Sequence, residues 1–154
     1  MNIPTFLEQR RCWFEHVLHQ PTYCAQRLAH ELHVPGREVA KTVLLRADGR
    51  GKYVVAVLPA HRKIDLEQVE KLLGKGQPEL ATEAEVAEQF PDCELGTLPP
   101  FGSQYGMKTI VDSSLAEDEK IVFESNTHHE AIRMRFDEFC KLEQPVIAQF
   151  TTSQ

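Results

Sequence analysis

The sequence predicts one mixed α/β domain over residues 1–154, with a mostly antiparallel sheet or a partly closed barrel flanked by helices. A chain of 154 residues is long enough for a single hydrophobic core. Helical and strand patterns alternate irregularly, which favours a mixed sheet over a doubly wound parallel one. The Gly-rich motifs of nucleotide-binding folds, G-x-G-x-x-G and G-x-x-x-x-G-K-[ST], are missing from the sequence.

Two helices and a hairpin are expected in the first half of the chain. Apolar residues recur at helical spacing over Thr5–His19 and over Thr22–Leu32. The runs Thr42–Ala47 and Tyr53–Leu58 are rich in Val and Leu, and the Gly-containing segment Asp48–Gly51 separates them. This pattern predicts a hairpin. Its nearly continuous apolar character predicts burial on both faces.

Capping boxes and short apolar runs define the second half. Asp65 with Gln68, and Thr82 with Glu85, match the capping-box spacing, so a helix is expected after each. Gly74 ends the first of these helices. The other expected elements are strands at Glu79–Ala81, Thr109–Asp112, Ile121–Glu124 and Glu130–Met134, and a final helix at Asp137–Leu142.

Charge and cysteine usage limit the partners that can be expected. The net charge is −6, yet Arg37–Lys75 contains nine cations and five acids. Such a chain could contact a few phosphates on one face without binding DNA indiscriminately; a solvated mosaic of charges is the simpler interpretation. The four cysteines form no C-x-x-C pair, which fits a reducing cytoplasm. No secretory signal or membrane-spanning run is visible, so no membrane partner is expected.

The segment Glu94–Gly102 and Lys41 are the strongest candidates for chemistry. The segment reads E-L-G-T-L-P-P-F-G, and its Gly and Pro residues predict a rigid loop whose free N–H groups could hold an oxyanion. An ordinary turn has the same composition. Lys41 lies at the mouth of the hairpin, where an ammonium could hold a phosphate or a developing negative charge. A lysine that snorkels from a strand end is the alternative.

Other catalytic classes are poorly supported. Adjacent His128 and His129 cannot easily share a metal, and no G-x-S-x-G elbow is present. Asp92 and Glu94 flank Cys93 and should raise its pKa, which argues against a thiolate nucleophile. We therefore expect no metal and no cofactor, and a reaction in which water attacks a reactive ester. The remaining histidines are expected at the surface (His16, His19, His30, His33) or in a basic loop with Arg62 and Lys63 (His61).

Several segments, in order, resemble the YbaK/prolyl-tRNA synthetase-associated family of aminoacyl-tRNA editing domains. They are Thr22–Lys41 with Thr42, Val55–Leu66, Leu80–Glu83, the G-x-x-x-P loop Gly96–Pro100 continued by Phe101-Gly102, Ile110–Asp112 and His128–Ile132. No single motif is specific to the family. The occurrence of all of them in this order over most of the chain is specific. One departure is the run Phe90–Glu94, which lacks a glycine expected in close relatives.

The resemblance implies a trans-editing deacylase that hydrolyses the ester of mischarged aminoacyl-tRNA, with tRNA-Pro carrying a small amino acid as the expected substrate and a synthetase as a further partner. Lys41 would anchor the terminal adenosine or its phosphate, and backbone amides around Gly96 and Gly102 would hold the carbonyl oxygen. The resemblance places these residues around the aminoacyl group: Thr42, Thr97, Leu98, Pro99, Pro100, Phe101 and His128.

Two other functions remain open from the sequence. A module of the same fold could bind tRNA or a synthetase without turnover, since the run Phe90–Glu94 alters the expected pocket wall. A small-molecule esterase or amidase could use the same pocket.

Overall fold

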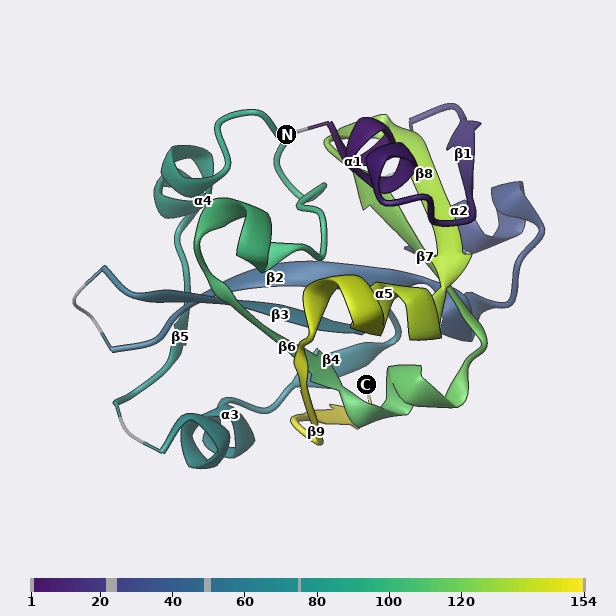
Figure 1. Ribbon diagram of the computed structural model, residues 1–154. Coiled ribbons are helices and arrows are strands. Elements are labelled where there is room, and N and C mark those ends of the chain that lie inside the picture. Colours follow the sequence, from purple (N-terminus) through teal and green to yellow (C-terminus); the bar gives the residue numbers. More distant parts are fainter. Residues whose placement is uncertain (1, 22–24, 49–50, 75, 154) are drawn as a thin grey trace.

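Three β-sheets organise the chain in a computed structural model, which describes residues 2–21, 25–48, 51–74 and 76–153 (Figure 1). The helices are α1 (Ile3–Gln9), α2 (Ala25–Leu32), α3 (Leu66–Leu73), α4 (Glu83–Gln89) and α5 (Phe136–Glu143), with short 3₁₀ helices at Gly36–Glu38, Gly102–Tyr105 and Ser113–Glu117. The strands are β1 (Phe14–Leu18), β2 (Ala40–Arg46), β3 (Tyr53–Pro59), β4 (Arg62–Ile64), β5 (Glu79–Leu80), β6 (Lys108–Asp112), β7 (Lys120–Ser125), β8 (Thr127–Arg135), β9 (Val146–Ala148) and β10 (Thr151–Ser153).

The largest sheet has five strands in the order β5-β2-β3-β6-β9. Its β5–β2 and β2–β3 pairs are antiparallel, whereas β3–β6 and β6–β9 are parallel. The two smaller sheets, β1-β8-β7 and β10-β4, are antiparallel throughout. The mixed α/β prediction is therefore confirmed. Among the described residues the large sheet ends at β5 and β9, so it is open and does not form the barrel that was the alternative.

The core lies on both faces of the large sheet. Side chains of β3 alternate between the two faces, so Val55 and Val57 join one hydrophobic cluster while Val54 and Leu58 join another. The first cluster fills the space towards α1, α5 and the three-stranded sheet, and the second packs against α3. This explains the continuous apolar run in β3 and confirms its burial on both faces.

The N-terminal helix is much shorter than predicted. Instead of continuing to His19, α1 ends at Gln9, and Arg11 adopts a left-handed conformation (φ 58°). Phe14–Leu18 then forms β1, an edge strand paired with β8. The apolar spacing of this segment fits a helix, but hydrogen bonding to β8 decides its conformation.

The predicted caps are confirmed. The Asp65 side chain accepts hydrogen bonds from two backbone amides at the start of α3, and Thr82 forms a complete capping box with Glu85. The start of the predicted Thr22–Leu32 helix and the middle of the Asp48–Gly51 turn lie outside the described residues. Three short strands were not predicted, at Arg62–Ile64, Val146–Ala148 and Thr151–Ser153.

Candidate functional site

A cavity of about 490 Å³ opens where β2 and β7 separate. The two strands meet at an isolated parallel bridge between Val39 and Val122 and form no further pairs along their described residues. The start of β2 forms one side, which we call the strand wall (Ala40, Lys41 and Thr42). The opposite side is the loop wall (Leu95, Gly96, Leu98 and His128). The end of β7, helix α2, the residue before β2 and the turn after β3 complete the lining, with Phe123, Glu124, Leu28, Val39 and Ala60.

Half of the predicted site residues meet at this cavity. Lys41, Thr42, Gly96, Leu98 and His128 all line it, although more than eighty residues separate the first from the last in sequence. The other predicted residues do not line the cavity; they are Thr97, Pro99, Pro100, Phe101 and Gly102. These five residues are buried behind the loop wall.

Phe101 and Gly102 support the cavity from the protein interior. Phe101 is fully buried and packs edge-on against Phe6 and Phe139 at 5.4 Å between ring centroids. The Gly102 amide donates to Thr109 Oγ1 at 3.0 Å, and this hydroxyl in turn donates to Glu143. The Gly102 N–H is therefore committed to the core and is not available to an oxyanion, contrary to the role that the resemblance implied.

The loop wall is hydrogen-bonded to the turn between β7 and β8. Glu94 N donates to Asn126 O at 2.8 Å, and Asn126 N donates to Thr97 O at 3.1 Å. Within the loop, the Thr97 hydroxyl donates to Glu94 O at 2.7 Å. Gly96 (φ +88°) and Asn126 (φ +68°) both have left-handed backbone conformations, which Gly and Asn tolerate best. The loop is thus fixed in shape before any ligand arrives.

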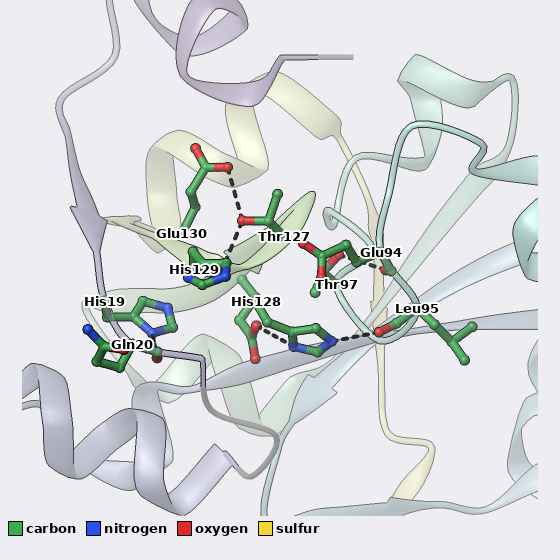
Figure 2. A network of polar contacts seen from close by, with 10 residues as sticks. His19, Gln20, Glu94, Leu95, Thr97, Thr127, His128, His129 and Glu130 are labelled. Carbon is green, nitrogen blue, oxygen red and sulfur yellow. Dashed lines mark hydrogen bonds and ion pairs between the residues drawn. The ribbon is translucent and has the colours of Figure 1, made fainter.

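His128 connects the loop wall to Glu124. Its Nε2 lies 2.8 Å from Leu95 O, and its Nδ1 lies 3.0 Å from Glu124 Oε2 (Figure 2). Leu95 O can only accept, so Nε2 carries a proton. The second contact then needs a further proton, either on Nδ1 or on the Glu124 carboxyl. Burial raises the pKa of Glu124, and the neighbouring His128 opposes that shift. The pair therefore links the end of β7 to the loop through Leu95.

Lys41 is the cation of the cavity. It is half-buried, and this burial lowers the pKa of its ammonium. No described carboxylate lies within ion-pair distance of Lys41, unlike Arg37 or Arg133, which are bonded to Asp118 and Glu38. A partly desolvated ammonium without a counter-ion is suited to an anionic or strongly polar ligand.

The remaining cysteine and histidine side chains considered as catalytic groups are either unreactive or lie outside the cavity. The pKa of Cys93 is raised, as predicted, but the cause is burial and not the charges of Asp92 and Glu94, and the thiol is not a ready nucleophile. His16, His30 and His33 are exposed as expected, whereas His19 is half-buried and its Nε2 is enclosed without a partner. In the described part of the chain, no three His, Cys, Asp or Glu side chains are arranged to hold a metal, and no helix is long and apolar enough to cross a membrane.

Comparison with known families decides the assignment. The profile of a family described as the aminoacyl-tRNA editing domain matches residues 19–142, which is most of the chain. The chain belongs to this editing-domain family. The prediction made from the ordered motifs is therefore confirmed, and the matched region contains every residue of the two walls.

Individual relatives agree with the family. The multifunctional Ser/Thr-tRNA deacylase ProXp-y of Escherichia coli K12 is 27% identical over 114 residues, which cover 72% of this chain and 68% of that protein. The crystal structure of the hypothetical protein APE2540 superposes with a TM-score of 0.88 at 20% identity, covering 97% of this chain and 99% of the other. A candidate trans-editing enzyme for prolyl tRNA synthetase gives 0.85 at 19% identity, with 98% and 95% covered. The two structures establish that the editing domain shares their fold.

Sequence reasoning did not name seven of the lining residues as site residues: Leu28, Val39, Ala40, Ala60, Leu95, Phe123 and Glu124. Glu124 and Phe123 belong to a strand that was predicted, but no local signal shows which strand ends will separate to leave a cavity. Leu95 contributes its carbonyl oxygen, a group that every residue has. Such residues can be found only once the tertiary structure brings the two walls together.

Proposed function

We propose that this editing domain is a trans-acting deacylase that hydrolyses the ester linking a small amino acid to tRNA, with tRNA-Pro as the expected carrier. The observation that supports it is the cavity itself: an ammonium without a counter-ion on one wall, a preformed loop on the other, and family membership that selects an aminoacyl-tRNA as the ligand. A volume of about 490 Å³ is sufficient for an aminoacyl group with part of a terminal adenosine.

The reaction is a simple ester hydrolysis. Water attacks the ester carbonyl carbon and forms a tetrahedral oxyanion; the bond to the ribose oxygen then breaks, and this oxygen takes up the proton that the water loses. Free amino acid and tRNA are the products. Lys41 anchors the terminal adenosine or its phosphate, and a ribose hydroxyl assists the water. Positioning and charge stabilisation supply the rate enhancement.

The walls suggest how the amino acid is selected. Leu98 and Phe123 are buried side chains on the cavity lining, so they restrict the size of the amino-acid side chain. A hydrophobic pocket rejects a substrate that merely adds a hydroxyl only weakly, by about 100-fold. Alanine and serine therefore belong in the same test panel. The relative ProXp-y is named a Ser/Thr-tRNA deacylase, so threonine is the next amino acid to test as a substrate.

The basic turn beside the cavity is a candidate contact for the tRNA backbone. Ala60 lines the cavity, and the next residues along the chain are His61, Arg62 and Lys63. His61 and Lys63 are exposed, whereas Arg62 is held by the Thr151 hydroxyl at 2.6 Å. We assign phosphate binding to the exposed side chains of His61 and Lys63. The substrate would be met in the cytoplasm, where aminoacyl-tRNA is made and used.

The test is hydrolysis of a panel of tRNAs charged with alanine, serine, threonine, cysteine and proline, measured by loss of the labelled amino acid. We expect a mischarged tRNA-Pro to lose its amino acid fastest, and Pro-tRNA-Pro to be spared. Turnover of none of them would contradict the proposal. Binding of tRNA or of a synthetase without cleavage would identify a non-catalytic module, and cleavage of simple esters alone would identify a small-molecule esterase.

A further inference from the structure

The strand wall exposes backbone groups that the sheet does not use. In an antiparallel pair, alternate residues of a strand bond to the partner and the others point away from it. Two contacts show which residues of β2 bond to β3: Ala60 N donates to Val39 O, and Ala47 N donates to Lys52 O. The odd-numbered residues of β2 therefore bond to β3. Thr42 is opposite Val57 in the register, and its N–H and C=O point to the other edge.

Two further observations confirm that the odd-numbered residues of β2 are the ones that bond to β3. Leu44 O accepts from Ala81 N, on the side of β5 and away from β3. Ala40 is opposite Pro59, which has no N–H to donate, as a pair without hydrogen bonds allows. The even-numbered residues of β2 thus present their polar backbone groups to the edge opposite β3.

This edge is open only along the strand wall. At one end Val39 bridges Val122 of β7, and at the other Leu45 and Arg46 pair with β5. Between these contacts no described residue bonds to Thr42 N–H or C=O, and its buried Oγ1 also has no partner. A buried hydroxyl without a partner is rare and costs about 1–3 kcal/mol. The open stretch coincides with the cavity.

We propose that Thr42 N–H is the hydrogen-bond donor to the ester carbonyl oxygen, and that the carbonyl of Ala40 accepts from the α-ammonium of the same aminoacyl group. An aminoacyl ester has its ammonium and its carbonyl on neighbouring atoms, so it offers the donor and the acceptor that a strand edge receives. The Thr42 N–H then stabilises the oxyanion when water attacks. This role replaces the one that the committed Gly102 amide cannot fill. The inference rests on the proposed deacylase function.

The test removes the backbone N–H of Thr42 and keeps its side chain. Replacing Thr42 by the matching α-hydroxy acid turns the Lys41–Thr42 amide into an ester. The matched control makes the same change at Leu44, which lies on the same edge of β2 outside the cavity lining. Each replacement also weakens one carbonyl within the β2–β3 ladder, at Lys41 or at Val43, so the two variants carry similar damage to the strand.

The expected result is a loss of about 100-fold or more in single-turnover rate at Thr42, the range for removal of one oxyanion donor, with the Leu44 variant close to wild type. Thermal unfolding of both variants checks that the fold is intact. Equal losses in the two variants, or a Thr42 variant as fast as wild type, would overturn the proposal. An inactive wild type would instead contradict the deacylase function itself, so the two failures are distinguishable.

Discussion

The loop wall of the cavity is braced by hydrogen bonds to the turn between β7 and β8, whereas the strand wall has an open edge. Next to the loop wall, Glu94, Thr97 and Asn126 bond to one another, and within the wall His128 bonds to the Leu95 carbonyl. In the strand wall, Thr42 keeps three polar groups without described partners and Lys41 has no counter-ion. The difference indicates a division of work: the loop wall defines the shape of the cavity, and the strand wall binds the substrate.

Removal of the Lys41 ammonium should have the largest effect. We expect Lys41→Ala to lower kcat/KM by about 100-fold or more, since a charge aimed at the substrate is lost from a partly desolvated site. Lys41→Arg should restore part of the rate. Lys71→Ala removes an exposed lysine on α3 and serves as the matched control. Equal rates for Lys41→Ala and wild type would remove Lys41 from the mechanism.

Gly96 tests the loop wall. An alanine here must adopt φ +88°, which costs about 1–2 kcal/mol, and its Cβ would lie 3.5 Å from the His128 ring. Gly74→Ala meets the same backbone strain (φ +80°) with open space around it, far from the cavity lining. We expect similar losses in unfolding free energy for both variants, but a fall in kcat/KM of about tenfold for Gly96→Ala alone. Equal activity in the two variants would show that the loop need not be fixed.

Glu124 tests how the loop is held. Burial raises the pKa of its carboxyl, so the folded protein binds this proton more tightly than the unfolded chain does. The stability from this group is fully present below its unfolded pKa and is lost as pH rises through the raised folded pKa. Glu124→Gln should therefore gain stability relative to wild type as pH rises above the ordinary glutamate pKa of about 4.3. Melting curves from this pH upwards measure it, and a constant difference in Tm would contradict it.

A cation outside both walls should matter least. Lys63→Ala is expected to weaken tRNA binding a few-fold and to reduce the slope of log affinity against log salt by about one. Lys141→Ala, at an exposed position on α5, is the control. If the slope does not change, the basic segment His61–Lys63 does not face the phosphates.

The sequence was most informative where local chemistry decides the structure. The caps at Asp65 and Thr82 and the buried β2–β3 hairpin follow from residue types at fixed spacing. The Phe14–Leu18 segment was misread because pairing with β8 outweighs its helical apolar spacing. Strands of two or three residues are too short to show any period.

The same distinction holds for the site. Lys41 and the Gly96 loop could be identified because unusual residue types mark them. The Glu124–His128 pair and the open edge of β2 could not, since they depend on which strands separate in the folded chain. Asn126, with φ +68°, gives the turn between β7 and β8 a left-handed backbone conformation, which Asn adopts more readily than most residues.

The most direct test of the division between the walls is binding of a non-hydrolysable amide-linked alanyl-adenosine, followed by the backbone amide shifts of the labelled protein. The account predicts that the chemical shift of the Thr42 amide proton changes most, in the direction of a stronger hydrogen bond. The chemical shift of the Leu44 amide proton should not change. A bound analogue that shifts Gly96 and Gly102 but leaves Thr42 unchanged would contradict it, and would return the substrate-binding role to the loop.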